Sequence, residues 1–304
     1  MKDAITVLLT GATGYVGSAW LQQPAARVSK VVLLVRNPAG ETIHTRPGIS
    51  TVVQQGSIPE TLPEDLLGGV DVVIHLAQSL TPDSGPEADP EQDERWTRSL
   101  GAACKERGIA FIFASTGALY QNKTGDKLTE QAPAEPHNAY TRSKGASEQV
   151  LLSLAQEGLP LAIVRFGSIF GPGPAVNYNR AVNKFVAEAA AGVPMSVWST
   201  AMSQMRPYTY IGDCVAAINF IIDRNLFSGD IYNVVSENAT GRTIVEEIVR
   251  QVPGARTEVR DSVRMNELSY GMDDAKIRSL GFTPRGTLKA GIQELLSHLS
   301  RKNI

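Results

Sequence analysis

The stretch Ile5-Thr-Val-Leu-Leu-Thr10-Gly11-Ala-Thr-Gly14-Tyr-Val-Gly17 decides the fold. Its first six residues form an apolar run with β-branched members, which predicts a buried strand, and three spaced glycines follow at once. A strand that ends in such a turn and enters a helix is typical of the site that holds the diphosphate of a dinucleotide. Gly11 would allow the tight turn, Gly14 the close approach of the ligand and Gly17 the close packing of the helix. The alternative is a glycine-rich turn without a ligand.

The rest of the first half of the chain alternates short apolar runs with helical stretches, which predicts an α/β fold with a parallel sheet covered on both faces. We expect a doubly wound Rossmann domain over residues 1–168, joined by returning strands near 206–235. Residues 169–205 and 236–304 are expected to form a smaller C-terminal lobe that binds the substrate. The predicted strands are 5–10, 30–35, 51–55, 71–77, 110–114, 161–165, 207–211 and 230–235, and the clearest predicted helices are 91–107, 145–156, 178–191, 243–251 and 288–301.

Composition narrows the class of protein. The 304 residues are 42% hydrophobic and carry a net charge of −2, with 29 basic and 31 acidic residues and no run of one sign. This charge offers no basic surface for nucleic acid or for an anionic membrane. Cys104 and Cys214 are the only cysteines, without the spacing of a metal site, and no apolar stretch reaches the length of a membrane span. We therefore expect a soluble cytoplasmic protein without a metal.

The residue that ends the second strand discriminates between the two nicotinamide dinucleotides. A carboxylate there would accept a hydrogen bond from the ribose 2′-hydroxyl, whereas arginine would pair with a 2′-phosphate. The strand ends in Val35-Arg36-Asn37, which favours NADP(H) over NAD(H). The alternative for Arg36 is a solvated surface side chain. Ser57, after the third strand, is expected near the adenine.

A catalytic constellation is predicted at the end of the fifth strand and at the start of a later helix. Ser115 and Thr116 follow the strand, and Tyr140 precedes Lys144 by four residues, which places both on one face of a helix. A phenol is a weak base at neutral pH, but a nearby ammonium favours its phenolate. Tyr140 could then exchange a proton with a sugar hydroxyl while hydride leaves or reaches its carbon, and Thr116 would hydrogen-bond the same oxygen.

With these motifs, the chain resembles the extended short-chain dehydrogenases/reductases, in the group of nucleotide-sugar epimerases, dehydratases and ketoreductases. The resemblance implies a Rossmann domain, a C-terminal substrate lobe and a homodimer formed through the helix that carries Tyr140 and Lys144 together with its neighbouring helix. It spans nearly the full length and rests on Thr10–Gly17, His75–Ala77, Ser115–Tyr120, Tyr140 and Lys144, Arg165–Pro172, Arg206–Asp213 and Tyr232–Val234.

The resemblance assigns roles to individual positions. Thr116, Tyr140 and Lys144 match the catalytic trio, and Arg206 matches the arginine that grips the substrate diphosphate; its alternative is an ion pair with Asp213. The expected cofactor-binding residues are Gly11, Thr13, Gly14, Tyr15, Val16, Gly17, Arg36, Ser57, Leu76, Ala77 and Lys144. The expected substrate-binding residues are Ser115, Ser168, Asn177, Trp198 and Arg206, although Trp198 could equally be a half-buried core residue, and Ser168 stands where the family often has asparagine.

Departures from the family pattern narrow the reaction. Sugar 4,6-dehydratases of the family carry an Asp-Glu pair just after the catalytic hydroxyl, whereas this chain has Gly117 and Ala118, so dehydration is disfavoured. Because Arg36 favours NADPH, we expect an NADP(H)-dependent reductase of a nucleotide-activated keto sugar, with C4 as the reacting carbon. One alternative is a nucleotide-sugar 4-epimerase with a retained cofactor, and a second is a non-catalytic NADP(H)-responsive binding protein.

Overall fold

The apolar runs form a seven-stranded sheet in the computed structural model, which describes residues 4–35, 46, 49–55, 66–81, 89–120, 125–261 and 269–302. The strand order is β11-β7-β5-β4-β1-β2-β3, and β1 pairs in parallel with both β2 and β4. The chain therefore leaves β1 on one side and returns on the other, which is the switch point at which doubly wound sheets bind ligands. The strands are β1 (Ile5–Thr10), β2 (Val28–Val35), β3 (Ser50–Gln55), β4 (Val72–His75), β5 (Ala110–Thr116), β7 (Leu161–Phe166) and β11 (Ser228–Val234).

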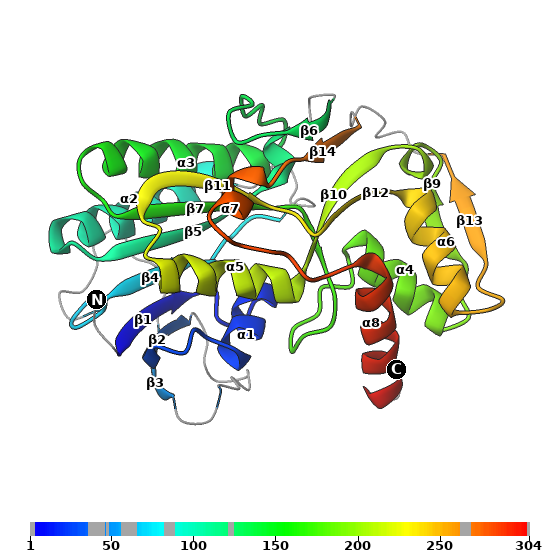
Figure 1. Cartoon of the computed structure of the whole chain (residues 1–304), viewed down its shortest axis with the longest axis horizontal. Coiled ribbons are helices and arrows are strands. Elements are labelled where there is room, and N and C mark those ends of the chain that lie inside the picture. Colours follow the sequence, from blue (N-terminus) through cyan, green and yellow to red (C-terminus); the bar gives the residue numbers. More distant parts are fainter. Residues whose placement is uncertain are drawn as a thin grey trace. The chain divides into compact units, whose positions relative to one another are not determined.

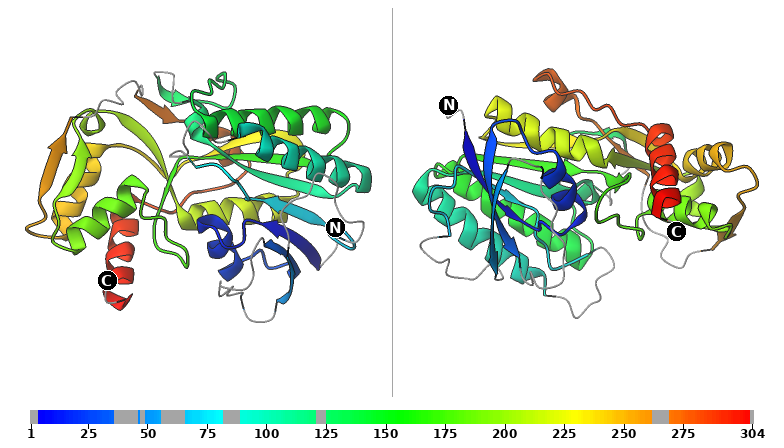
Figure 2. Two further views of the ribbon diagram at one scale, coloured as in Figure 1. Left: turned by 180° about the vertical axis from the view of Figure 1, so that it is seen from behind. Right: turned by 90° about the horizontal axis from the view of Figure 1, so that it is seen from below.

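Helices cover both faces of this sheet (Figures 1 and 2). On one face α2 (Pro90–Arg107) and α3 (Ala139–Gln156) lie side by side against β5. On the other face lie α1 (Tyr15–Gln22) and α5 (Ile211–Arg224), which Trp20 joins by donating its indole N–H to Asn219. Because both faces are covered, the central strands are buried almost throughout, as parallel strands require. The predicted fold class is confirmed.

Helix α3 begins earlier than its apolar pattern indicates. We expected a helix from residue 145, whereas α3 starts at Ala139. Asn138 is its N-cap and accepts a hydrogen bond from the Thr141 backbone at 2.8 Å, while the Thr141 hydroxyl accepts one from the backbone N–H of Asn138. This reciprocal capping box satisfies backbone donors that the helix itself leaves unpaired. Tyr140 and Lys144 consequently lie inside the helix, one turn apart.

The chain divides into two compact units. The first contains residues 1–119, 136–165 and 215–232, and the second contains residues 120–135, 166–214 and 233–304. The second has its own apolar core, which includes Phe170, Val186 and Ile248. Its elements are β6 (Gly125–Leu128), β8 (Ser168–Phe170), α4 (Ala181–Ala190), β9 (Met195–Trp198), β10 (Met205–Tyr210), β12 (Glu237–Thr240), α6 (Gly241–Gln251), β13 (Thr257–Arg260), β14 (Tyr270–Met272), α7 (Ala275–Ser279) and α8 (Leu288–Lys302).

This division differs from the predicted one in two places. The strand β10, expected with the nucleotide-binding domain, pairs with β12 and β8 in a separate three-stranded sheet. Residues 120–135 join the second unit because β6 pairs with β14. The differences have related causes. An apolar strand such as β10 reveals its burial through its sequence but not its distant pairing partner, and the largely polar sequence of β6 shows no strand pattern.

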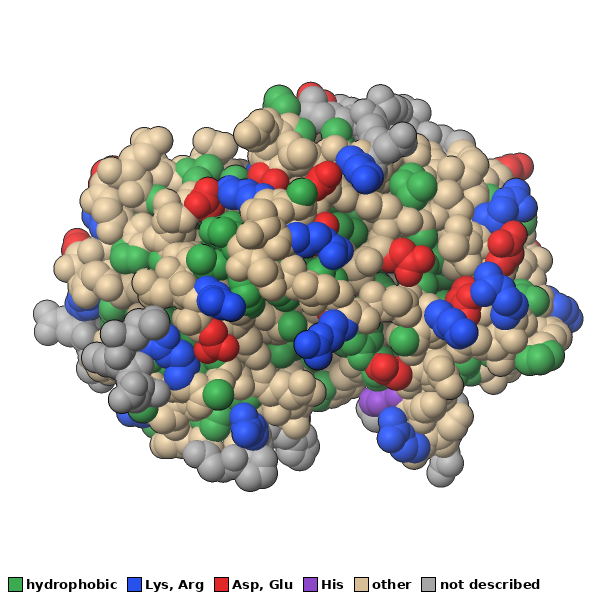
Figure 3. Space-filling model, in the orientation of Figure 1, with side chains coloured by type: hydrophobic (Ala, Val, Ile, Leu, Met, Phe, Trp, Pro, Cys, Tyr) green, Lys and Arg blue, Asp and Glu red, His purple; other side chains and the backbone are tan. Residues whose placement is uncertain are grey.

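Charged side chains of both signs are interspersed on the face shown in Figure 3. This distribution agrees with the net charge of −2. Among the described helices, none combines the length and the apolar character that crossing a bilayer requires.

Candidate active site

The glycine turn after β1 has the backbone geometry that its spacing predicts. Gly11 has a positive φ of +73°, and a Cβ there would lie 2.7 Å from the backbone nitrogen of Ala77. Gly17 is buried in α1, and a Cβ on it would lie only 2.2 Å from the carbonyl oxygen of Gly11. The backbone therefore excludes side chains at both positions, and α1 is held close against the turn.

The turn fits a bound diphosphate. Gly14 is the N-cap of α1, and its lack of a side chain leaves open the space in front of the first helical turn. Backbone N–H groups and the positive end of the helix dipole point toward that space, which suits an anion. Thr13 lies in the turn, and Tyr15 and Val16 begin the helix. Arg36 and Ser57, the two residues expected at the adenosine end, lie outside the described residues.

The end of β4 lies directly beside the glycine turn. The backbone N–H of Leu76 donates to the carbonyl of Thr10, and that of Ala77 donates to the Thr10 hydroxyl at 3.2 Å. The Thr10 hydroxyl also lies 2.7 Å from Nδ1 of His75, whose Nε2 lies 3.2 Å from the Thr97 hydroxyl. Leu76 and Ala77 are thus held next to the glycine turn.

His75, to which the sequence assigned no chemistry, is the centre of this contact network. It is buried, and burial together with the nearby Lys144 ammonium lowers its pKa to about 3. The imidazole is therefore neutral at physiological pH. Because the Thr97 hydroxyl donates to the carbonyl of Asp93, its oxygen can accept a hydrogen bond from the Nε2–H group of His75, which leaves Nδ1 as the acceptor for the Thr10 hydroxyl.

Ser115 and Thr116 end β5 and have different partners. The Thr116 hydroxyl accepts a hydrogen bond from the backbone N–H of Ala118 at 3.1 Å, at the start of the 3₁₀ turn Gly117–Tyr120. The Ser115 hydroxyl is buried and donates to Oε1 of Glu148 at 2.5 Å. A substrate contact through Ser115 would therefore use the remaining lone pairs of its oxygen.

Lys144 is anchored on the same strand. Its Nζ donates to the carbonyl of Ala114 at 2.6 Å and lies 4.6 Å from the centre of the Phe113 ring. Burial lowers its pKa to about 8, while the carboxylates of Asp93 and Glu148 act in the opposite direction. The ammonium is thus desolvated but held by acidic neighbours, which suits a group that must stay charged near a phenol.

Tyr140 lies one helical turn before Lys144 and is half-buried. Both residues belong to the same face of α3, because a spacing of four residues returns a side chain to one side of a helix. The first compact unit therefore brings together the glycine turn, the end of β5 and the Tyr140–Lys144 face. The predicted catalytic trio and the predicted cofactor residues that the structure describes all belong to this unit.

Three buried charged residues of this region were missed by the sequence analysis. Asp93 accepts hydrogen bonds from the backbone of Ser79 at 2.8 Å and from the Ser143 hydroxyl at 3.2 Å. Glu148 and Arg165 form a buried ion pair. Two features of the sequence point to this pair. Glu148 follows Lys144 by four residues and so belongs to the same helix face, and Arg165 is a charged residue within an otherwise apolar strand.

The remaining predicted substrate residues belong to the second unit. Ser168 begins β8, and Asn177 accepts a hydrogen bond from the backbone of Asn179. Trp198, at the end of β9, is 48% exposed, so it is accessible to a ligand rather than enclosed in the core.

Arg206 has contacts within the second unit. Its guanidinium donates to the carbonyl of Met205 at 3.0 Å and lies 5.2 Å from the ring of Tyr270. Asp213, the alternative partner that the sequence suggested, accepts hydrogen bonds from the Ser236 hydroxyl and from the backbone of Arg285 and Gly286. These contacts are compatible with a guanidinium that still presents donors to an anion.

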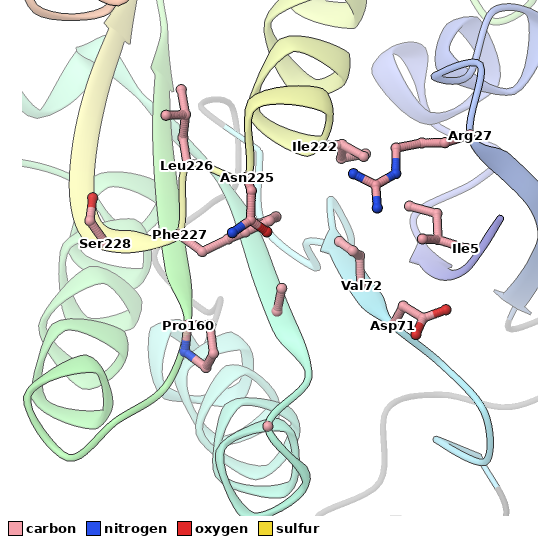
Figure 4. A pocket seen from close by; sticks show the side chains of 12 residues that line it. Ile5, Arg27, Asp71, Val72, Pro160, Ile222, Asn225, Leu226, Phe227 and Ser228 are labelled. Carbon is pink, nitrogen blue, oxygen red and sulfur yellow. The ribbon is translucent and has the colours of Figure 1, made fainter. Parts of the chain in front are cut away.

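A cavity of about 580 Å³ opens where the strands of the seven-stranded sheet begin, at their amino-terminal ends (Figure 4). It is lined where β1 and β4 begin, by Ile5 and Val72, and by the α5–β11 connection around Phe227. Arg27 and Asp71 supply its charged groups. The glycine turn follows the opposite end of β1, so this cavity is separate from the candidate active site.

The sequence places the chain in a known family. Residues 7–234 match the model of the NAD dependent epimerase/dehydratase family, which spans the glycine turn, the end of β5 and the Tyr140–Lys144 face. The chain belongs to this family. The resemblance to extended short-chain dehydrogenases/reductases is thereby confirmed.

Individual relatives are similar over nearly the whole chain. An uncharacterized UDP-glucose epimerase of Bacillus subtilis is 24% identical, over 97% of this chain and 98% of the relative. A Thermus thermophilus UDP-glucose 4-epimerase, solved in complex with NAD, has a TM-score of 0.81 and 24% identity and covers 97% of this chain and 99% of its own. A Bacillus cereus UDP-glucuronic acid 4-epimerase, solved with UDP-glucuronic acid and NAD, has a TM-score of 0.83 and 21% identity, over 98% and 100% of the two chains.

Proposed function

We propose that this protein is a nucleotide-sugar 4-epimerase that keeps its nicotinamide cofactor bound through the catalytic cycle. The observation that carries the proposal is the joint presence of the glycine turn, Thr116 and the Tyr140–Lys144 face in one unit, with Lys144 anchored on β5. Membership in the NAD dependent epimerase/dehydratase family, and the names of the three relatives above, support epimerisation over other reactions.

The side chains of the first unit divide the work of such a reaction. Tyr140 would remove the proton of the sugar hydroxyl as a phenolate and return it after the carbonyl has been reduced from the other face. Lys144 would stabilise that phenolate by its charge, and the Thr116 hydroxyl would hold the reacting oxygen. A bound nicotinamide would supply the acceptor and donor of hydride for the sugar carbon.

Epimerisation replaces keto-sugar reduction as the leading candidate. Reduction was favoured because Arg36 suggested NADPH, but the relatives named above are epimerases, and two of them were solved with NAD. A preference for NADP(H) over NAD(H) remains a separate proposal that rests on Arg36 alone. Dehydration lacks an acid–base pair, since Gly117 and Ala118 occupy the 3₁₀ turn after Thr116.

Substrate binding is proposed for the second unit. Arg206 would pair with a diphosphate oxygen through the planar guanidinium, which suits bidentate contacts with phosphate. Trp198 would stack on a nucleobase through its exposed ring. Homodimer formation through α2 and α3, and a location in the cytoplasm, are proposed from the family resemblance.

The experiment that tests this function uses the purified protein. The nucleotide that remains bound after gel filtration is identified first, and UDP-, dTDP- and GDP-hexoses are then incubated without added cofactor. Interconversion of C4 epimers without net change in the absorbance of reduced cofactor supports the proposal. Stoichiometric consumption of NADPH with a 4-keto sugar would establish the reductase instead, and no conversion of any sugar would favour a non-catalytic binding protein.

A further inference from the structure

A buried carboxylate connects the helix that carries Tyr140 to the two strands below it. Glu148 is 1% exposed and lies one turn after Lys144, so Tyr140, Lys144 and Glu148 share one face of α3. A buried carboxylate is costly unless it is paired and hydrogen-bonded, so its partners indicate why it is there.

Both oxygens of Glu148 are occupied. Oε1 accepts hydrogen bonds from the Ser115 hydroxyl at 2.5 Å and from Nε of Arg165 at 2.9 Å, and Oε2 accepts one from Nη2 of Arg165 at 2.5 Å. Ser115 is the penultimate residue of β5, Arg165 is the penultimate residue of β7, and these two strands are neighbours in the sheet. The carboxylate therefore ties α3 to the ends of two adjacent strands.

The second tie between α3 and β5 comes from Lys144. Its Nζ donates to the carbonyl of Ala114, one residue before Ser115. The contacts of Lys144 and Glu148 thus fix how α3 is placed along β5. The two residues are one helical turn apart on α3, and their partners are adjacent residues of β5. Thr116 is the next residue of that strand, so its position relative to Tyr140 depends on both contacts.

We propose that Glu148 is a positioning residue: its carboxylate, held by Arg165, locks the Tyr140–Lys144 face of α3 onto the Ala114–Thr116 end of β5. The negative charge of Glu148 also raises the pKa of Lys144 and so counteracts part of the lowering that burial causes. The inference rests on the proposed function in so far as it concerns turnover. Among the described residues, Asp93 of α2, Glu148 of α3 and His75 of β4 interact electrostatically with Lys144. Tyr140 lies one helical turn before Lys144, and Arg165 of β7 pairs with Glu148.

The test compares two ways of removing the carboxylate. Glu148→Gln keeps the shape but leaves Arg165 as a buried, unpaired cation, which could prevent folding. The double variant Glu148→Leu/Arg165→Met removes both charges, and replacing a buried ion pair with apolar residues of similar size is often neutral for stability. Glu157→Gln is the matched control, because Glu157 forms an exposed ion pair with Lys105 at the end of the same helix.

Turnover and the titration of Lys144 are then measured. Lysine labelled with carbon-13 at Cε is followed by NMR, and the Lys144 signal is assigned by comparison with Lys144→Arg. We expect the double variant to fold, to lose kcat by about 10- to 100-fold with little change in KM, and to shift the Lys144 midpoint down by about one pH unit. The downward direction follows because the carboxylate of Glu148 raises the pKa of Lys144, whereas Arg165, whose positive charge is removed together with it, is not among the groups that shift that pKa.

Either of two results overturns the inference. A double variant with wild-type kcat would show that the pair only stabilises the fold, and an unchanged Lys144 midpoint would show that Glu148 does not act on that residue. The NMR titration needs no substrate. If the wild-type protein converts no nucleotide sugar, the proposed function fails, while the titration still decides the positioning role.

Discussion

Tyr140 carries the central acid–base role in the proposed reaction, and its replacement separates chemistry from binding. In the Tyr140→Phe variant the helix and the position of Lys144 should be retained, because the ring keeps its packing and loses only the hydroxyl. We expect turnover of nucleotide sugars to fall by about 10²- to 10⁴-fold, while the affinity for the nicotinamide cofactor stays close to that of the wild type. Steady-state kinetics and fluorescence titration with NADH measure the two quantities. Wild-type turnover in the variant would refute the proposed acid–base role.

Buried His75 makes stability depend on pH. Its pKa is about 3 in the folded protein and near 6.5 in the unfolded chain, so the unfolded state binds the proton first. The stabilising contribution of the neutral imidazole is therefore fully present above about pH 6.5 and is lost as the pH falls toward 3. In that range this group lowers the free energy of unfolding by about 1.4 kcal/mol per pH unit.

Urea unfolding at pH 7, 6 and 5 measures this dependence. We expect His75→Gln to flatten the loss of stability on acidification, whereas replacing the exposed His137 with Gln should leave the slope close to that of the wild type. If the stability of His75→Gln fell in parallel with that of the wild type, the buried imidazole would not be its source.

The proposed preference for NADP(H) over NAD(H) rests on one residue of the sequence. If Arg36 pairs with a 2′-phosphate, Arg36→Asp should remove a charge-assisted contact and add repulsion, which weakens NADP(H) binding by about 10- to 100-fold more than NAD(H) binding. Calorimetric titration with both cofactors measures the ratio. Equal losses for the two cofactors would contradict the role assigned to Arg36.

Among the elements, the β1–α1 turn leaves no room for side chains at two of its glycines. A Cβ on Gly17 would lie 2.2 Å from the carbonyl oxygen of Gly11, and a backbone atom cannot move away as a flexible side chain can. Gly17→Ala should therefore displace α1 from the turn and lower cofactor affinity by about tenfold or more. Gly101→Ala is the control, because the atoms nearest to its Cβ would be the side-chain ends of Leu151, Leu154 and Leu159. Wild-type cofactor affinity in Gly17→Ala would contradict this account of the turn.

Elements with strong local signals could be predicted, and those defined by distant partners could not. The apolar run Ile5–Thr10 and the glycine turn specify their structure within a short stretch, and β1 and α1 follow them closely. The start of α3 was missed because it depends on the capping pair Asn138 and Thr141, which a search for apolar periodicity does not detect. Strands such as β8, with three residues, are too short to show a pattern.

The candidate site shows the same contrast. Tyr140 and Lys144 could be found because their spacing is a property of one helix. The Glu148–Arg165 pair joins α3 to β7, and the partners of Asp93 come from other segments. Their charges are visible in the sequence, but their burial is decided by tertiary packing, so only the structure reveals the network beneath Lys144.

For the molecule as a whole, the central claim is that one cofactor removes a hydride from the sugar and returns it to the same carbon. The decisive measurement uses nucleotide hexoses deuterated at C4, with the purified protein and no added cofactor. The account predicts that the C4 epimer forms with its deuterium retained at C4, because the label passes to the bound nicotinamide and back. Deuterium found on free, released cofactor, or lost from the product, would contradict it.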